Sequence, residues 1–506
     1  MGSRAAADLV PGPNPNTSFI PYPFRINRTL EEVIAEHVPV YEWSWTETVF
    51  QSWETMLLIM ATFWCIFMAR LVTHKLGLYS SPNRCYGVEF ALIILPCILL
   101  VTVAVDYSYY VGVLMLLVTL WFLLNSNFME RARSRQKFDL GNRPIALSVL
   151  RSVTHLLTAI CILAVDFESF YRPYRKSRQF GAKLMDVGIG LFVFTMGSVS
   201  RRTRHFSDLQ RSVVYSALPL ILLGLARTVA ILVVGYGQDE HEYGQHLNAF
   251  FTLGFTKLLG ALVSILARRD LHLLPLGFGL LLLHQFGLSV LGISDYVMDD
   301  EVSRSNLFNA NREGLVSLPG FVALYLLSIY VNRWMVAISQ LSYSEMVKKL
   351  RRLFFIALIL WNLFGLSAYG IGISRVTCNF GYVMWMMAIG ASTLLTSFGA
   401  IDFVINSVMP WVPNESEVDE QERGLLTDET EAKGRIKPIV PFTISQALNQ
   451  NGLTFFLVAN LLTGGVNIFL KPEDRSGLES VVILLVYMFL ATKLVHELLK
   501  RGIRLA

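Results

Sequence analysis

The chain has 506 residues, of which 53% are hydrophobic and only 16% are charged, and its formal net charge is +5. Soluble domains carry about 25% charged residues, so this composition excludes an ordinary soluble protein and favours one whose solvent is largely lipid. The five cysteines lack CxxC or Cys/His spacing, which argues against disulfides and a zinc site. No nucleic-acid motif accompanies the positive charge, so no nucleic-acid partner is expected.

The first 50 residues are polar and rich in proline, and we expect them to form a segment in the lumen of the secretory pathway. They have no basic leader followed by an apolar core and a small-residue cleavage site, so we expect the first true span to insert the chain. Asn16-Thr17-Ser18 and Asn27-Arg28-Thr29 match the N-glycosylation acceptor pattern. The alternative is that these triplets arise by chance.

Residues 51–506 predict a single all-α membrane domain with about thirteen transmembrane helices. Apolar segments of about 20 residues recur almost to the C-terminus, and each is long enough to cross ~30 Å of hydrocarbon. We place the spans near residues 55–72, 88–105, 108–124, 145–165, 183–200, 213–235, 248–266, 273–292, 315–333, 352–372, 381–406, 452–470 and 479–498.

Lysine and arginine predict the sidedness of these spans. An odd number of spans puts the two termini on opposite sides, and one set of alternate loops holds about twice as many basic residues as the other. The positive-inside rule therefore predicts a lumenal N-terminus and a cytosolic C-terminus. The basic set contains Arg131, Arg133, Arg135, Lys137, Arg143, Arg201, Arg202, Arg204, Arg211, Lys348, Lys349, Arg351, Arg352, Lys500, Arg501 and Arg504.

Residues 409–450 interrupt the apolar pattern with an acidic run and few aromatic residues. Such a composition buries too little apolar surface to fold alone, so we expect a disordered cytosolic loop. The two halves of the chain show no repeat, which weakens the case for an inverted-repeat transporter.

The expected lumenal connection after the fourth span breaks the charge rule. It begins at Asp166 and carries five basic residues, which could serve as a helix end with headgroup anchors or as a functional site. In the functional interpretation, a carboxylate accepts a proton from a hydroxyl nucleophile while cations bind phosphates or stabilise an oxyanion. If Asp166 and Lys176 approach each other, their charges offset the desolvation of both groups. The basic residues are Arg172, Arg175, Lys176, Arg178 and Lys183.

A family resemblance is carried by residues 156–167, by Lys176 and Gly181, and by Leu184-Met185-Asp186-Val187-Gly188-Ile189-Gly190. These residues resemble the signature of the glycosylphosphatidylinositol-anchor inositol acyltransferases, the PIG-W family. Further similarity covers most of the chain, in residues 242–248, 311–314, 317–320 and 459–464.

Members of this family are endoplasmic-reticulum membrane enzymes that move a fatty acyl group, typically palmitoyl, from acyl-CoA to the inositol ring of glucosaminyl-phosphatidylinositol. The resemblance implies that activity here, with acyl-CoA as co-substrate and glucosaminyl-phosphatidylinositol and membrane lipids as partners. It also implies that Asp166 and Lys176 belong to the catalytic centre. The sequence has no metal cluster, P-loop or dinucleotide fingerprint, so no bound cofactor is expected.

Several ionisable side chains lie inside the expected spans, where each should face the bundle interior or a wet cavity and find a partner. Asp186 and Arg227 are the preferred functional pair, because together they could shape a phosphate-binding cavity. The alternative is a buried structural ion pair. The embedded residues are Arg151, His155, Asp186, Arg227, Lys257, His284 and Asp402.

Further candidates for substrate binding lie in the segments that resemble the family. His246 with Asn248 could bind the glycolipid headgroup, and Asn311 with Glu313 could contact sugar hydroxyls. Helix capping or an interfacial hydrogen bond is the alternative for these residues, and a polar contact between helices is the alternative for Asn460. The cations expected to hold phosphates are Arg172, Arg175 and Lys183.

The leading hypothesis is direct transfer, in which the inositol hydroxyl attacks the acyl-CoA thioester without an acyl-enzyme. Asp166 assists removal of the hydroxyl proton, and Lys176 positions or stabilises charged groups. One alternative is a multi-span lipid or solute transporter, since buried charges suit a translocation pathway equally well. Another is a noncatalytic scaffold in an anchor-assembly complex.

Overall fold

Long apolar helices make up most of this computed structural model, which describes residues 43–505 apart from 79–80, 126, 135–136, 141–142, 235–239 and 406–442. Most of the expected N-terminal segment, both glycosylation triplets and most of the expected loop 409–450 lie outside the described residues. The all-α, multi-span fold class is confirmed, because the strands described are the two-residue pair β1 (Phe138–Asp139) and β2 (Gln340–Leu341).

The first half of the chain forms helices that are separated by short turns and, in two places, continued by π-helical turns. They are α2 (Trp45–Lys75), α3 (Pro82–Glu89), η2 (Phe90–Ile94), α4 (Leu95–Val101), η3 (Val105–Tyr107), α5 (Ser108–Asn125), α6 (Phe128–Ser134), α7 (Ile145–Ala164), η4 (Arg172–Tyr174), η5 (Leu184–Asp186), α8 (Val187–Ser198), α9 (Phe206–Ser212), η6 (Val213–Ala217), α10 (Leu218–Val234) and α11 (Glu240–Tyr243).

The second half follows the same plan and ends in a long helix. Its elements are α12 (Ala249–Ser264), η7 (Asp270–His272), α13 (Leu273–Val290), α14 (Ile293–Met298), α15 (Leu307–Ala310), α16 (Arg312–Met335), α17 (Tyr343–Gly370), α18 (Phe380–Ser397), η8 (Phe398–Ile405), α21 (Ile444–Gln450), α22 (Gly452–Leu470), η9 (Pro472–Asp474) and α23 (Gly477–Lys500).

Within the described residues, eleven helices are long and apolar enough to cross a membrane. The remaining two expected spans, at 183–200 and 248–266, correspond to the shorter apolar helices Leu184–Ser198 and Ala249–Ser264. At 1.5 Å per residue a 16-residue helix is about 24 Å long, less than the hydrocarbon thickness. Both short helices pack against the buried helix α16.

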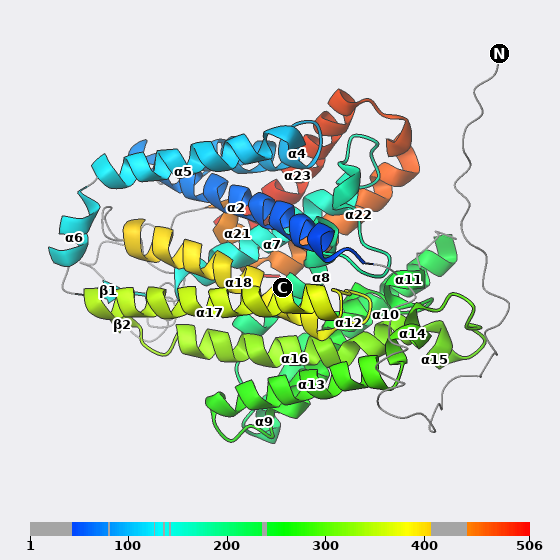
Figure 1. The fold of residues 1–506 in the computed structure, drawn as a ribbon. Helices are drawn as coiled ribbons and strands as arrows, with labels where there is room; N and C mark the ends of the chain where they lie inside the picture. Colours follow the sequence, from blue (N-terminus) through cyan, green and yellow to red (C-terminus); the bar gives the residue numbers. More distant parts are fainter. Residues whose placement is uncertain are drawn as a thin grey trace, which may run out of the picture.

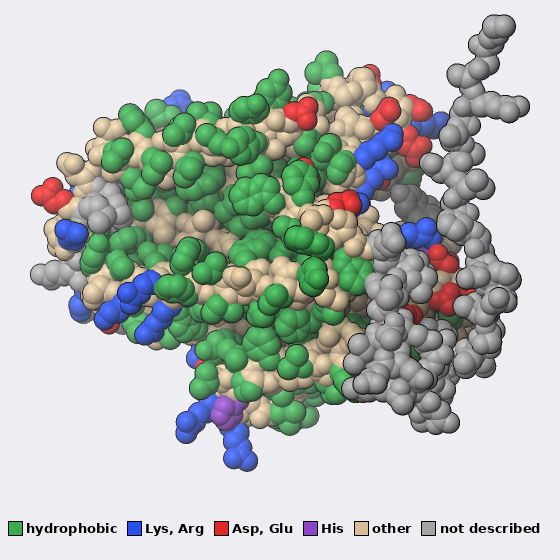
Figure 2. Space-filling model, in the orientation of Figure 1, with side chains coloured by type: hydrophobic (Ala, Val, Ile, Leu, Met, Phe, Trp, Pro, Cys, Tyr) green, Lys and Arg blue, Asp and Glu red, His purple; other side chains and the backbone are tan. Residues whose placement is uncertain are grey.

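The helices divide into a buried centre and a periphery. In α7 and α16, 72% of the most apolar stretch is buried, whereas the figure is 6% for α5 and 11% for the helix that contains α10. Exposed apolar side chains on α5 and α10 are suited to contact lipid tails. Figure 2 shows hydrophobic side chains over the middle of the molecule and charged side chains gathered at its two ends.

Many of the long helices lie side by side, so the bundle has two ends (Figure 1). One carries α6 and the two short strands, and we call it the α6 end. The opposite end carries α11, α14 and α15, and we call it the α11 end. The unusual basic loop after α7 reaches the α11 end, where Lys176 contacts Glu242 of α11.

Several helix boundaries differ from the predicted ones for local reasons. α2 begins at Trp45, inside the expected lumenal segment, because the Ser44 side chain accepts from the Glu47 amide and starts the helix. α17 begins at Tyr343 because Ser342 and Glu345 form a capping box, in which the side chain of each accepts from the backbone amide of the other. The basic residues Lys348, Lys349 and Arg351, which we expected in a loop, therefore lie on this helix. α21 lies inside the expected loop 409–450, where it packs against α7 and α23.

Two buried carboxylates close helix N-termini that belong to other parts of the chain. The oxygens of Asp402 accept from the Ile145 and Ala146 amides of α7, both at 2.9 Å. Similarly, Glu89 accepts from the Ile444 amide of α21 at 2.6 Å. Because the first amides of a helix have no partner within the helix, these carboxylates satisfy donors that would otherwise be buried and unbonded.

We predict that Asp402→Leu destabilises the protein by about 1–3 kcal/mol, because it leaves two buried N–H groups without acceptors. Asp402→Asn keeps one carbonyl oxygen and should cost less. Thermal unfolding of the purified protein in detergent, followed by tryptophan fluorescence, measures the difference. Equal Tm values for wild type and Asp402→Leu would contradict the capping role.

Candidate active site

Segments far apart in sequence meet at the α11 end and bring charged side chains together. Lys176, in the loop after α7, forms an ion pair with Glu242 of α11. Asp186, which precedes α8, binds Arg375 in the loop between α17 and α18. The unusual basic loop is therefore built into a polar cluster contributed by several helices.

Asp166 directly follows the C-terminal turn of α7, and its half-buried carboxylate points to α22. Its Oδ2 accepts a hydrogen bond of 2.9 Å from Nδ2 of Asn467. Burial raises the pKa of Asp166 above its ordinary value, while the Asn467 hydrogen bond and the charges of Lys176 and Arg175 act in the opposite direction. A carboxylate with a raised pKa is a better proton acceptor than an ordinary surface aspartate.

Lys176 pairs with Glu242 rather than with Asp166, which differs from the direct contact considered from the sequence. The Lys176 and Glu242 side chains are 37% and 18% exposed, so the pair is open to solvent on one side. Burial raises the pKa of Glu242, but the nearby cations Lys176 and Arg375 outweigh it, and the pKa lies below its ordinary value. The charge of Lys176 also lowers the pKa of Asp166, so the two predicted catalytic residues share one electrostatic field.

Asp186 pairs with Arg375 and not with Arg227, the partner expected from the sequence. Its fully buried carboxylate accepts from Arg375 Nε at 3.2 Å and from the Ser177 amide at 3.1 Å. Arg227 lies exposed on the peripheral helix α10, where its charge lowers the pKa of Glu242. The expected pairing is wrong because Asp186 precedes the central helix α8 and faces the loop before α18.

Arg375 connects the two halves of the polar cluster. Its side chain is 4% exposed, and its guanidinium lies 5.8 Å from the ring centre of Tyr243. Burial lowers the pKa of Arg375, but the carboxylates of Glu242 and Asp186 outweigh the effect of burial and hold the pKa above its ordinary value. The arginine therefore remains a cation that links the loop after α7 to α11.

His246, Asn248 and Asn311 hold the backbone around α12. Asn311 Oδ1 accepts from the His246 amide at 2.9 Å, and its Nδ2 lies 3.1 Å from His246 Nδ1. Asn248 Oδ1 accepts from the Phe250 and Phe251 amides and caps α12. These contacts match the capping and hydrogen-bonding alternatives.

Glu313 and Asn460 also have structural partners. Glu313 is 2% exposed and forms ion pairs with Arg304 at 2.6 Å and Arg312 at 3.6 Å. Asn460 donates to the Phe456 carbonyl of its own helix at 2.7 Å. Both side chains thus use contacts within the protein.

The remaining candidate cations line the loop after α7. Arg172 and Arg175 are exposed, and Arg175 Nη2 donates to the Val165 carbonyl at 3.4 Å. Lys183 is half-buried, and its backbone amide donates to Asp186 at 3.2 Å. Arg172 and Arg175 are therefore accessible to an anionic headgroup, and Arg175 lies close enough to Asp166 to lower its pKa.

Sequence reasoning did not assign Arg375, Glu242 or Asn467 to the site. Arg375 had a faint signal, since it is a lone arginine in a short turn between two apolar spans. Glu242 opens the family-like segment 242–248. The partners of both residues are distant in sequence, so no spacing could reveal them.

We predict that Arg375→Met destabilises the protein by about 3–5 kcal/mol, because it leaves the carboxylate of Asp186 buried without its counter-ion. Arg375→Lys keeps the charge but loses the planar fork, so we expect a smaller loss. Arg211→Gln, an exposed change on α9, is the matched control for removing an arginine. Unchanged Tm values for Arg375→Met would show that the ion pair carries little stability.

Comparisons with a family model and with related proteins agree on one family. A GWT1 family model matches residues 47–498. An uncharacterized protein of Arabidopsis thaliana is 30% identical over 434 residues, covering 85% of this chain and 91% of that protein. GPI-anchored wall transfer protein 1 of Schizosaccharomyces pombe is 31% identical over 378 residues, covering 74% of this chain and 75% of that protein.

The human glucosaminyl-phosphatidylinositol-acyltransferase PIGW is 29% identical over 375 residues, covering 70% of this chain and 73% of that protein. The resemblance to the PIG-W inositol acyltransferases is thereby confirmed. Since the family match runs from the first turn of α2 to the last turn of α23 and contains every segment of the site, the chain belongs to the GWT1 family.

Proposed function

We propose that this protein transfers a fatty acyl group, palmitoyl, from acyl-CoA to the inositol ring of glucosaminyl-phosphatidylinositol in the endoplasmic-reticulum membrane. The acceptor and the reaction class are those in the human relative's name. One observation carries the proposal: the half-buried carboxylate of Asp166 is held by Asn467 beside the cations of the loop after α7.

The chemistry needs a base for a hydroxyl nucleophile. Asp166 accepts the inositol hydroxyl proton as the oxygen attacks the thioester carbonyl, so that a C–O bond forms and the C–S bond breaks. The thiolate of coenzyme A takes up a proton when it leaves. No acyl-enzyme is needed, because both substrates meet at one site.

Cations around Asp166 have a separate role. Lys176 stabilises negative charge that develops on the thioester oxygen, while Glu242 fixes the position of the lysine. The exposed guanidinium groups of Arg172 and Arg175 bind phosphates of the two substrates. Apolar helices around this end of the bundle hold the acyl chain and the acceptor's lipid tails close together.

The same proposal places the α11 end in the lumen, the N-terminus in the lumen and the C-terminus in the cytosol. The basic residues of the α6 end, such as Arg131 and Arg133 of α6, support this orientation through the positive-inside rule. Acyl-CoA is then the co-substrate that must reach the lumen-facing centre.

We predict that Asp166→Asn and Lys176→Met each lower kcat by at least about 10²-fold, because each removes a group that acts on the reacting atoms. Purified protein in lipid vesicles receives palmitoyl-CoA and glucosaminyl-phosphatidylinositol, and mass spectrometry identifies the acylated product. Lys183→Met, a nearby lysine that lacks the carboxylate partner of Lys176, serves as a comparison and should lose less.

Robust transfer by both purified variants would contradict the assigned roles. Movement of lipid across the vesicle membrane without any acylated product would instead favour a transporter. Activity that needs added partner proteins and ignores both substitutions would favour a scaffold.

We predict that Asn467→Leu shifts the acidic limb of the pH–rate profile to higher pH. The Asn467 hydrogen bond lowers the pKa of Asp166 against the effect of burial, so its removal raises the pKa further. Asp166 must be deprotonated to act as a base, and activity is lost as pH falls through this pKa. The measurement is kcat/KM against pH for wild type and variant, and an unshifted profile would rule out this role for Asn467.

A further inference from the structure

The central helix α7 is buried over most of its length except along one narrow stripe. Among residues 149–164, the partly exposed side chains are those of Arg151, Thr158 and Ile162. They follow one another at seven and four residues, a spacing that puts them on one face of the helix, and Asp166 continues the row four residues later. The accessible stripe of α7 therefore leads to the proposed base.

The neighbouring helix α8 has a matching stripe. Its partly exposed residues are Gly188, Phe192 and Met196, at four-residue spacing, while the rest of the helix is buried. A Cβ on Gly188 would lie 3.7 Å from the side chain of Thr158. The ring centres of Phe192 and His155 lie 5.1 Å apart. The two stripes are therefore adjacent and border the same space.

α22 forms the third side of this space. It lies at the periphery, with 22% of its apolar stretch buried, and its Asn467 holds Asp166 at one end of the stripe. Further along, the ring of Phe456 lies 5.0 Å from that of Phe192. Between these contacts, a Cβ on Gly464 would meet no atom of the described residues within 4 Å. We call the space between α22 and the stripes of α7 and α8 the α22 slot.

Aromatic rings close the α22 slot at its deep end. Phe456 contacts Phe192 and also Phe250 of α12, whose ring centre is 5.8 Å from its own. His155 packs edge-on against Phe192. A Cβ on Gly452 would lie 2.7 Å from Nε2 of His155, so the start of α22 packs tightly against the histidine. The slot therefore ends at these rings.

The length of the α22 slot fits a fatty acyl chain. At 1.5 Å per residue, Asp166 and His155 lie about 16 Å apart along α7. Half of the ~30 Å hydrocarbon core is ~15 Å, which is the depth that the acyl chains of one leaflet fill. Because most of its lining is apolar, the slot favours a hydrocarbon chain over water.

The proposed chemistry at Asp166 identifies which chain this is. The carbonyl carbon that the hydroxyl attacks is the first carbon of the donor's acyl chain, so that chain must begin beside Asp166. The acceptor's lipid tails begin farther away, because a phosphate and a glycerol unit separate them from the inositol. The slot begins at Asp166 and so fits the donor's chain.

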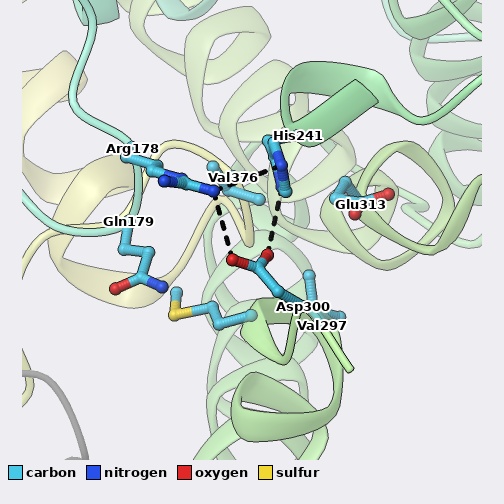
Figure 3. A pocket seen from close by; sticks show the side chains of 8 residues that line it. Arg178, Gln179, His241, Val297, Asp300, Glu313 and Val376 are labelled. Carbon is cyan, nitrogen blue, oxygen red and sulfur yellow. Dashed lines mark hydrogen bonds and ion pairs between the residues drawn. The ribbon is translucent and has the colours of Figure 1, made fainter. Parts of the chain in front are cut away.

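The hollow at the α11 end does not fit a hydrocarbon chain. It has room for about one water molecule. Its charged groups pair with one another, as Figure 3 shows: Arg178 Nη2 lies 3.1 Å from Asp300 Oδ2, and His241 Nδ1 lies 3.4 Å from Asp300 Oδ1. A chain that starts at Asp166 is therefore better accommodated by the α22 slot.

We propose that the α22 slot binds the acyl chain of the donor, with the thioester carbonyl at Asp166 and the end of the chain against Phe456 and Phe192. This inference rests on the proposed function, because the donor is the acyl-CoA of that reaction. The rings set the longest chain that fits, and so they determine the chain-length preference of the enzyme.

The first test removes a ring at the deep end. Phe456→Ala should raise the ratio of kcat/KM for stearoyl-CoA to that for palmitoyl-CoA about tenfold, roughly the gain from burying two further methylene groups. Phe469→Ala removes a ring from the same helix that is 82% exposed, so its ratio should equal that of wild type. An unchanged ratio in Phe456→Ala, or an equal shift in both variants, overturns the inference.

The second test fills the slot without disturbing neighbouring side chains. Gly464→Leu should lower kcat/KM for palmitoyl-CoA at least about tenfold, because the new side chain occupies the path of the acyl chain. Hexanoyl-CoA should lose less, since fewer of its carbons lie beyond Gly464.

Gly465→Leu is the matched control. A Cβ on Gly465 also meets no atom of the described residues within 4 Å, but this glycine follows Leu461 by four residues and shares its exposed outer face. Transfer by this variant should equal that of wild type. Equal losses in the two glycine variants, or equal losses of both donors in Gly464→Leu, would contradict the proposed path of the chain.

Photolabelling locates the chain without acyl transfer. The probe is palmitoyl-CoA with a diazirine at the last carbon, added to purified protein in phosphatidylcholine vesicles. We expect mass spectrometry to find the label in the peptides that contain Phe192 and Phe456. Unlabelled palmitoyl-CoA should remove this label, whereas additional phosphatidylcholine should leave it.

The outcomes of photolabelling separate the inference from the proposed function. Labelling of other segments overturns the inference whatever the transfer assay gives. Competition by phosphatidylcholine also overturns it, because the slot then holds membrane lipid. Specific labelling of both peptides in a wild type that transfers no acyl group would overturn the proposed function and leave the acyl-chain site in place.

Discussion

The α11 end depends on a buried cation, the guanidinium of Arg375. A charge removed from water needs partners that replace its hydration, and Asp186 provides a carboxylate at 3.2 Å while the ring of Tyr243 lies over the guanidinium. Asp186 in turn accepts from the Ser177 and Lys183 amides. The loop after α7 is thereby fixed at Ser177, which directly follows Lys176, and again at Lys183.

These fixed positions explain how Asp166 and Lys176 interact electrostatically without a direct ion pair between them. Asp166 is oriented by Asn467 from α22, and Lys176 is oriented by Glu242 from α11. The base and the cation therefore have separate supports, and no ion pair with Lys176 occupies the carboxylate of Asp166. A direct ion pair between Lys176 and Asp166 would lower the basicity of Asp166 further, which opposes proton transfer.

Buried carboxylates have a second use in this protein, at the ends of helices. Asp402 and Glu89 each satisfy amides of a helix from another part of the chain. Inside a membrane bundle, such donors cannot hydrogen-bond to bulk water, so a side chain must accept from them instead. The same embedded acids that suggest function in a membrane sequence can therefore be structural, and only their partners distinguish the two cases.

The sequence by itself determined the all-α class, the positions of most spans and the loop that breaks the charge rule, because length and hydropathy are properties of consecutive residues. Tertiary structure alone decided the partners: Arg375 for Asp186, Glu242 for Lys176 and Asn467 for Asp166. The starts of α2 and α17, by contrast, follow from local caps, in which Ser44 and Ser342 each accept from the amide of a glutamate three residues later. The physical reason is that hydropathy is a property of consecutive residues, so the sequence alone reveals it. Buried charges, in contrast, pair with whichever opposite charge lies close in space, and the packing of the helices sets that distance.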